Sequence, residues 1–157
     1  MALLLRPATS SDVPLLARMN RQLIEDEGSR NPMTVSELEN RVRSWIGGEW
    51  HVVLFEVQAK ATGYAVFQTR SDDYLPATPT VYIRQFFIMQ EARGKGLGRR
   101  AFAALAATCF PAGAQISLDV LATNPSGLRF WESLGFTTYC ITMRQSPGAL
   151  CQQPQNP

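Results

Sequence analysis

Three glycines at alternate positions, Gly94, Gly96 and Gly98, constrain the fold of this chain more than any other sequence feature. The residues before them, 81–89, form an apolar run rich in aromatic and β-branched side chains, which predicts a buried strand. Residues 101–109 repeat apolar side chains at helical spacing, which predicts a helix. Four basic residues lie among the glycines: Arg93, Lys95, Arg99 and Arg100. The segment therefore joins a strand to a helix through bare backbone and positive charge.

Such a junction suits a pyrophosphate. Glycine lets the backbone approach phosphate oxygens closely and adopt unusual φ values. The first N–H groups of the following helix are unpaired and carry the positive end of its dipole. A flexible turn with ordinary surface charges is the alternative interpretation.

Two better-known phosphate motifs do not fit. A Walker loop needs Ser or Thr after Gly-Lys, whereas Gly96 follows Gly94-Lys95. Residues 96–101 match the dinucleotide pattern G-x-G-x-x-A, and Asp119 follows where a ribose-binding acid is expected. However, residues 90–93 separate the glycines from the strand, and too little chain follows for a six-stranded Rossmann sheet.

The rest of the chain predicts two helices that begin at capping boxes, at Thr9 and Thr34, and a hairpin of strands 51–57 and 62–68. A strand over 116–121 and a helix after Asn124 follow the glycine segment. With strands over 2–6 and 137–143, the order is β-α-α-β-β-β-α-β-α-β. This order favours an α/β fold whose mixed sheet is mostly antiparallel, with one parallel pair. We expect one domain over residues 1–145 and a loose tail over 146–157.

Composition excludes several classes. The 157 residues suit one domain, and a net charge of +2 is too small to indicate a nucleic-acid-binding protein. The chain has no apolar run of membrane-spanning length, so no membrane partner is expected. Three well-separated cysteines argue against a disulfide framework and a zinc site, and fit a reducing cytoplasm. We expect no metal, and either a monomer or a homodimer.

The glycine segment resembles a known family. Arg93-x-x-Gly96-x-Gly98 matches the R/Q-x-x-G-x-G/A signature of the GNAT N-acetyltransferases. Asn124 and the segment FWESLGF, residues 130–136, are similar to a second family pattern at the same spacing. The resemblance covers residues 2–144 and implies a GNAT-like fold, acetyl-CoA as cofactor and an amine as acceptor.

The resemblance also implies roles for particular residues. The backbone of Phe86, Phe87 and Ile88 would pair with the pantetheine amides, although a plain core strand explains them equally well. The loop would hold the pyrophosphate through Arg93, Gly94, Lys95, Gly96, Leu97, Gly98 and Arg99. Asn124 would reach toward the cofactor arm, although Asn followed by Pro is also an ordinary helix N-cap.

The catalytic groups are less clear. Asp119 lies five residues before Asn124, where some relatives carry a glutamate that acts as general base; a solvent-facing acid at the end of a strand is the alternative. Trp131 stands in the cofactor site where many relatives have a tyrosine that protonates the leaving thiolate, and an indole cannot release that proton. Tyr82 and Tyr139 are the candidate replacements; the alternatives are that water supplies the proton or that the thiolate leaves unassisted. A CoA-binding module with impaired catalysis is therefore an alternative function.

Three consecutive acids, Glu25, Asp26 and Glu27, end the first predicted helix. In the GNAT family the loop after that helix flanks the acceptor cleft, so these acids favour a cationic acceptor such as a polyamine, an amino sugar or a basic peptide end. The alternative is a solvated helix end. A further departure from some relatives is Arg84-Gln85, which stands on the strand where they carry a glutamate.

Overall fold

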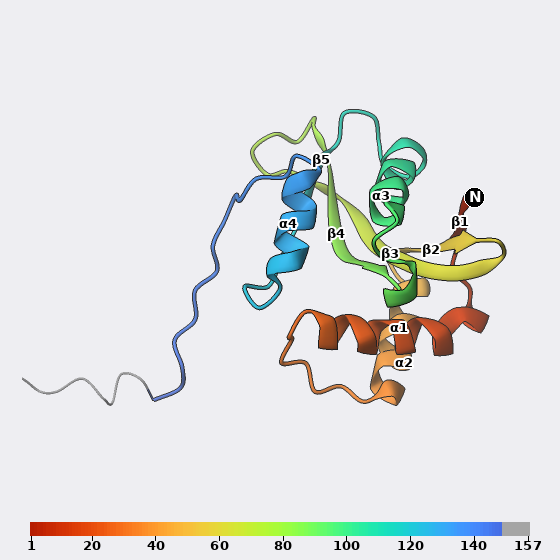
Figure 1. The fold of residues 1–157 in the computed structure, drawn as a ribbon. Helices are drawn as coiled ribbons and strands as arrows, with labels where there is room; N and C mark the ends of the chain where they lie inside the picture. The colour runs from red at the N-terminus through yellow and green to blue at the C-terminus, as the bar shows by residue number, and fades with distance from the viewer. Residues whose placement is uncertain (149–157) are drawn as a thin grey trace, which may run out of the picture.

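The computed structural model describes residues 1–148 (Figure 1). Its elements are β1 (Leu3–Pro7), η1 (Ser10–Asp12), α1 (Val13–Asp26), α2 (Val35–Ile46), β2 (His51–Val57), β3 (Lys60–Ser71), β4 (Pro79–Ile88), η2 (Gln90–Ala92), α3 (Leu97–Thr108), β5 (Gln115–Leu118) and α4 (Pro125–Ser133). This order confirms the predicted α/β fold from the first strand to the last helix. Within residues 1–148, no helix has the length and apolar character needed to cross a membrane.

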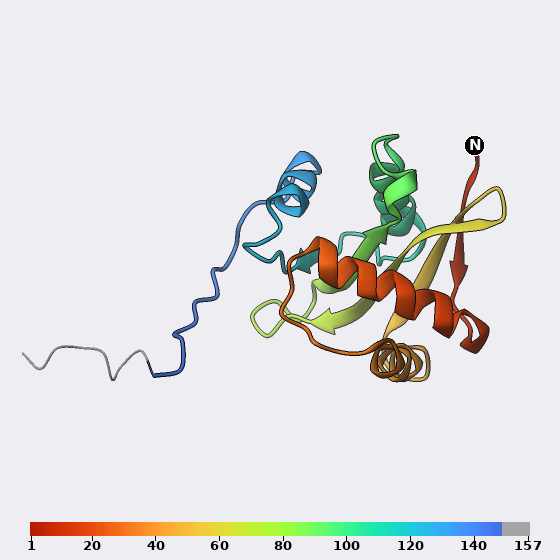
Figure 2. The same ribbon diagram turned by 60° about the horizontal axis from the view of Figure 1, so that its bottom comes forward.

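The five strands form one sheet in the order β1-β2-β3-β4-β5. Neighbours from β1 to β4 are antiparallel, and β4 and β5 form the predicted parallel pair. Helices cover both faces, with α1 and α2 on one side and α3 and α4 on the other (Figure 2). Because side chains alternate along a strand, Val52 and Leu54 of β2 pack toward α1 and α2, while Val53 and Phe55 pack toward α3 and α4.

Sequence-encoded caps fix where α1 and α2 begin. Thr34 Oγ1 accepts a hydrogen bond from Glu37 N at 3.3 Å, and Glu37 Oε2 accepts one from Thr34 N at 2.7 Å. This reciprocal pair satisfies backbone donors that the first turn of α2 leaves free. At the start of η1, which leads directly into α1, Asp12 accepts from Thr9 N at 2.8 Å and forms an ion pair with Arg6 at 2.9 Å. The two predicted helix starts are therefore confirmed.

Strands β4 and β5 separate where the site lies. They pair only over residues 80–83 and 115–118, and the last matched pair is Ile83 with Leu118. On the other edge of β4 the register with β3 shifts: Ile83 lies opposite Phe67 and Gln85 opposite Val66, which leaves Arg84 as an extra residue. Such a bulge bends a strand and re-aims its side chains. The second half of β4 consequently has no partner strand on its β5 side within the described residues.

The predicted strand over residues 137–143 is wrong for this chain taken alone. These residues have no regular secondary structure, and all their side chains are exposed. A strand needs a neighbouring edge to satisfy its backbone N–H and C=O groups, and the chain after α4 runs away from the sheet instead (Figure 1). Of the predicted tail 146–157, residues 149–157 lie outside the described part.

Candidate functional site

Two glycines of the loop between β4 and α3 adopt left-handed backbone conformations. Gly94 has a φ of 76° and Gly96 a φ of 73°. A Cβ added at either position would meet nothing within 4 Å, so the space beside the loop is open. The first hydrogen bond of α3 runs from Arg100 N to Gly96 O at 3.1 Å. The backbone N–H groups of residues 97–99 are therefore free to bind an anion at this helix start.

Gly98 has a different role from the other two. A Cβ at this position would lie 3.1 and 3.2 Å from two ring atoms of Phe130 in α4. That spacing is tighter than a normal side-chain contact, so glycine here lets α3 pack closely against α4. Only Gly94 and Gly96 shape the loop itself.

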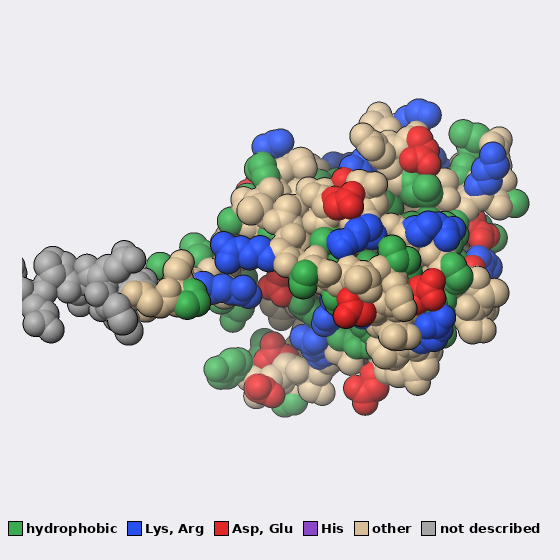
Figure 3. Space-filling view, turned by 90° about the horizontal axis from the view of Figure 1, so that it is seen from below, with side chains coloured by type: hydrophobic (Ala, Val, Ile, Leu, Met, Phe, Trp, Pro, Cys, Tyr) green, Lys and Arg blue, Asp and Glu red, His purple; other side chains and the backbone are tan. Residues whose placement is uncertain are grey.

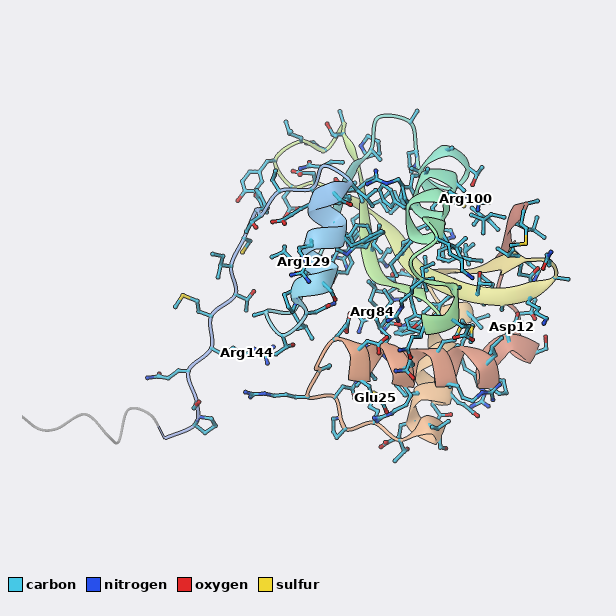
Figure 4. All side chains as sticks on the ribbon, viewed as in Figure 1. Asp12, Glu25, Arg84, Arg100, Arg129 and Arg144 are labelled. Carbon is cyan, nitrogen blue, oxygen red and sulfur yellow. The ribbon has the colours of Figure 1, made fainter. Side chains whose placement is uncertain are left out.

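Three of the four basic side chains around the loop bind other parts of the protein. Arg93 forms an ion pair with Asp26 at the end of α1, and its Nε donates to Ile88 O at 2.8 Å. Arg99 donates to Ser133 O at 3.0 Å, at the C-terminus of α4. Arg100 donates to Met1 O at 2.6 Å (Figure 4). Within residues 1–148, Lys95 makes no such contact and is available to an anion.

The residues at the end of β4 pack on both faces of the sheet. Phe87 belongs to the core beneath α1, whereas Phe86 packs against Trp131 on the opposite face, with ring centroids 5.3 Å apart. Their side chains thus serve the core. The backbone of this stretch, which β5 does not pair, leaves the predicted cofactor contact open.

The second family motif forms an aromatic cluster. The indole of Trp131 is buried and lies 5.7 Å from Phe102 and 5.2 Å from Phe136, measured between ring centroids. Asn124 caps α4, because its Oδ1 accepts from Gly127 N at 3.0 Å. The N-cap interpretation of Asn124 is confirmed, and its amide nitrogen is not used in that cap.

Two of the three catalytic candidates meet where the pairing between β4 and β5 ends. The hydroxyl of Tyr82 donates to Asp119 Oδ2 at 2.6 Å. Burial, together with this hydrogen bond to a carboxylate, raises the pKa of Tyr82 to about 12. Tyr139 is not part of this pair: it is 95% exposed in the segment after α4.

The three acids at the end of α1 have unlike surroundings. Glu25 is exposed, and Asp26 is bound to Arg93. Glu27 is half-buried; desolvation first, and the neighbouring charge of Asp26 second, raise the pKa of its carboxyl. The backbone carbonyl of Glu27 also accepts from Thr123 Oγ1 at 2.5 Å, which joins the end of α1 to the loop after β5.

Two arginines converge on Trp45 of α2. The guanidinium carbon of Arg41 lies 4.8 Å from the centre of the indole, and that of Arg84 lies 5.6 Å from it. Arg84 also lies 5.2 Å from the ring centre of Trp50 (Figure 4). Arg41 was missed by the sequence analysis, although its i, i+4 spacing from Trp45 on a predicted helix was the available signal.

Basic and acidic side chains are interspersed over the face formed by α1 and α2 (Figure 3). Within the described residues, no three His, Cys, Asp or Glu side chains gather as they would around a metal ion. The candidate binding and catalytic groups described above therefore lie at the glycine loop and at the opening between β4 and β5.

Comparisons with known proteins agree with this geometry. The model of the acetyltransferase (GNAT) family matches residues 20–136. The fold is similar to that of a possible acetyltransferase from Clostridium difficile 630, at 17% identity and a TM-score of 0.76, covering 93% of this chain and 97% of that one. A mutant of the BH1408 protein from Bacillus halodurans shares 27% identity at a TM-score of 0.70, covering 91% of this chain and 99% of that one.

A predicted acetyltransferase from Clostridium acetobutylicum, solved with acetyl-CoA, has a TM-score of 0.70 at 15% identity, covering 92% of this chain and 96% of that one. No curated protein matches the chain. Since the family model spans most of the sequence and both family motifs lie around the opening between β4 and β5, the chain belongs to the GNAT acetyltransferase family.

Proposed function

We propose that this protein transfers the acetyl group of acetyl-CoA to a primary amine. The observation that carries the proposal is the loop at the start of α3, where Gly94 and Gly96 have positive φ values and open space beside them. That loop follows, after η2, the half of β4 that has no partner strand on its β5 side within the described residues. A long thioester cofactor needs both features, an anion cradle for its pyrophosphate and a strand edge for its amide-bearing arm.

The residues present fit acetyl-CoA. The backbone N–H groups of residues 97–99, supported by Lys95, would hold the pyrophosphate. The edge of residues 86–88 that β5 does not pair, where Arg93 Nε occupies Ile88 O, would offer its remaining backbone groups to the pantetheine amides. Acetyl-CoA supplies the activated acyl group, while the protein contributes position and electrostatics. Arg93 and Arg99 serve the same site indirectly. Arg93 joins the loop to α1, and Arg99 joins α3 to α4.

Asp119 is the proposed general base. An amine with a pKa near 10 is mostly protonated at neutral pH, so the site must remove a proton before the amine can attack. The Asp119 carboxylate is exposed, and Tyr82 holds only its Oδ2. Oδ1 remains to accept the proton, directly or through a water molecule.

Tyr82 is better suited to positioning Asp119 than to protonating the leaving thiolate. Its pKa of about 12 lies well above the value of about 8.5 expected for a thiol, so proton transfer from Tyr82 to a thiolate runs uphill. Trp131 has no proton to give. We therefore propose that the thiolate leaves without a protein acid, which its modest basicity allows.

The test is an assay of free thiol release from acetyl-CoA with a panel of amines, alongside binding of acetyl-CoA measured by calorimetry. Turnover with at least one amine supports the enzyme. Binding of acetyl-CoA without turnover of any amine supports the alternative, a CoA-binding module with impaired catalysis, for which Trp131 is the motivating residue. A cytoplasmic location, expected from the three cysteines, stays a prediction.

The sequence-based prediction of a cationic acceptor depended on three free acids. Since Arg93 occupies Asp26, only Glu25 and Glu27 remain to attract a positive charge. We propose that Glu27 binds the ammonium group of the acceptor, because Glu27 is partly buried whereas Glu25 is exposed.

A further inference from the structure

Arg41 and Arg84 come from distant parts of the chain, α2 and β4, and meet at the indole of Trp45. Within residues 1–148, neither guanidinium forms an ion pair or a hydrogen bond with another residue. Burial first, and the charge of Arg84 second, lower the pKa of Arg41. Arg41 is half-buried and Arg84 is exposed, so the second guanidinium beside the same indole adds like-charge repulsion that a bound anion would relieve.

The nearest acid does not supply that compensation. Glu27 lies close enough to attract Arg41, yet it forms no ion pair with either arginine. By contrast, the arginines with structural roles have partners: Arg6 binds Asp12 and Glu56, and Arg43 binds Glu39 on the same helix as Arg41. What distinguishes Arg41 and Arg84 is that both guanidinium groups lie over one indole, that of Trp45, while neither has an acidic partner within residues 1–148.

The pair lies on the acceptor side of the proposed site. Arg84 is the extra residue of the bulge, directly after the last pair that joins β4 to β5. Trp50 connects it to the catalytic candidates, because its ring centre lies 5.2 Å from Arg84 and 6.2 Å from the ring centre of Tyr82. Tyr82 in turn holds Asp119. An acceptor held at the arginine pair would therefore extend past Trp50 to bring its ammonium end to the proposed base.

We propose that Arg41 and Arg84 bind an oxyanion of the acceptor, so that the acetylated substrate is an amine that also carries a carboxylate or a phosphate, with amino acids as the simplest class. The planar fork of each guanidinium matches such an oxyanion with paired hydrogen bonds. Glu27 and Asp119 then face the ammonium end of the same molecule. This inference rests on the proposed function. The sequence analysis expected a cationic acceptor, whereas the acceptor proposed here carries a negative group in addition to its amine.

The experiment compares matched pairs of amines that differ only in the oxyanion: an amino acid with its decarboxylated amine, and an amino alkyl phosphate with the corresponding amino alcohol. Each is measured in the thiol-release assay and by calorimetric titration in the presence of CoA. The anionic member should have a kcat/KM at least roughly tenfold higher, as expected for charge-assisted hydrogen bonds. The pair with the larger ratio of kcat/KM, anionic member over uncharged member, shows whether the site prefers a carboxylate or a phosphate.

Arg41→Gln and Arg84→Gln should each remove that preference and leave the uncharged partner and the KM for acetyl-CoA unchanged. Arg43→Gln, on the outer side of α2, is the matched control and should keep the preference. Equal kcat/KM within both pairs overturns the proposal while leaving acetyl transfer intact. If no amine turns over, titration still decides: loss of anionic-amine binding in Arg84→Gln supports the site, and equal binding in both proteins overturns it.

The segment after α4 carries a second inference on independent evidence. Tyr139, Ile141 and Met143 recur at every second position and are 95%, 77% and 88% exposed. Side chains at every second position share one face of an extended strand, so this segment presents an apolar face to water. In both ribbon views it leads away from its own sheet (Figures 1 and 2).

The sheet has an unpaired edge that could accept such a strand. In the part of the chain that the structure describes, β5 pairs with β4 on one edge and with nothing on the other. An open edge is a template for another strand. Each chain thus presents one free strand and one free edge. We infer that residues 137–143 pair with β5 of a second copy, reciprocally, in a dimer with twofold symmetry.

Sedimentation equilibrium of the full chain tests this inference, with a dimer expected at micromolar concentration. Ile141→Asp should yield monomers, because it puts a charge on the apolar face of the added strand. Thr142→Asp, on the opposite face, is the control and should remain dimeric. A monomeric wild-type protein overturns the inference, as does a dimer that Ile141→Asp leaves intact.

Discussion

The hydroxyl of Tyr82 donates to Asp119 Oδ2 at 2.6 Å, across 37 residues of sequence, and joins a residue of the last paired stretch of β4 to the residue that directly follows β5. This hydrogen bond fixes the carboxylate at the end of a short strand and leaves its second oxygen for the amine. It also joins a proposed base to a hydroxyl that stays protonated throughout the neutral range.

Asp119→Asn should lower kcat/KM by roughly a hundredfold at neutral pH, a typical contribution of general-base catalysis. At a pH near the pKa of the amine, the defect should shrink, because free amine is then abundant without a base. The measurement is a pH–rate profile of both proteins with one acceptor. A constant ratio across the whole range excludes Asp119 as the proton acceptor.

Tyr82→Phe should make the protein less sensitive to alkaline unfolding. The folded pKa of Tyr82, about 12, exceeds its usual value of about 10. The unfolded chain therefore loses this proton first, so the stability linked to Tyr82 is complete below about pH 10 and disappears as the pH rises toward 12. Denaturant midpoints across this window should fall less steeply in the variant. The control is Tyr74→Phe, at a tyrosine that is 91% exposed; its denaturant midpoint should fall with pH as steeply as that of the wild-type protein.

Gly96→Val should abolish acetyl-CoA binding in a protein that still folds. The left-handed conformation costs a non-glycine residue about 1–2 kcal/mol, and the branched side chain fills the space beside the loop. Gly113→Val is the matched control, since Gly113 has a φ of 72° with the same open surroundings in the turn before β5. Both variants should melt earlier than wild type, but only Gly113→Val should keep the stabilisation by acetyl-CoA. Cofactor binding by Gly96→Val would be incompatible with the proposed cradle.

Gly98→Ala should destabilise the fold by about 1–3 kcal/mol through overpacking against Phe130. Adding Phe130→Leu should restore part of that loss, because the ring atoms that the new methyl meets are removed. A double-mutant cycle of unfolding free energies measures this coupling. Strict additivity of the two changes would show that Gly98 is not held by its contact with α4.

Asp26→Asn should weaken acetyl-CoA binding, although Asp26 lies at the end of α1 and not in the loop. The reason is its ion pair with Arg93, which fastens the loop. Since partly exposed ion pairs contribute at most about 1 kcal/mol, Kd should rise by no more than roughly fivefold. Arg93→Gln should have a similar effect, and the double variant little more. Glu25→Gln, at an exposed acid without a partner in the described residues, should leave Kd unchanged.

Features written into contiguous sequence were the most predictable. The strand before the glycines, the caps at Thr9 and Thr34 and the left-handed turns at Gly94 and Gly96 depend on local preferences, and the structure has each of them. Gly98 looked identical to the other two glycines, because its role depends on Phe130 from a later helix. Local sequence could not separate loop shape from helix packing.

Features that depend on neighbours distant in the sequence were not predicted. Arg93 was predicted to face phosphate, but it binds Asp26 from a helix 67 residues earlier. The meeting of Arg41 with Arg84 needs α2 to lie over the bulge in β4, which no pattern in either segment reveals. The strand over 137–143 failed for a related reason: its side-chain alternation was present, but the segment leads away from the sheet and does not pair with the open edge of β5 in the same chain (Figure 1).

The parallel pairing at the end of the sheet has a consequence for motion. β5 is held by four residue pairs on a single edge, whereas β3 is bonded along both of its edges. In the monomeric Ile141→Asp variant, hydrogen exchange should therefore be fastest, among the strands, in β5, since local opening there breaks the fewest bonds. Asp119 follows that strand directly. Within one chain, the proposed base therefore follows the strand that the fewest residue pairs hold in the sheet, so opening of β5 would displace Asp119 from its place beside Tyr82.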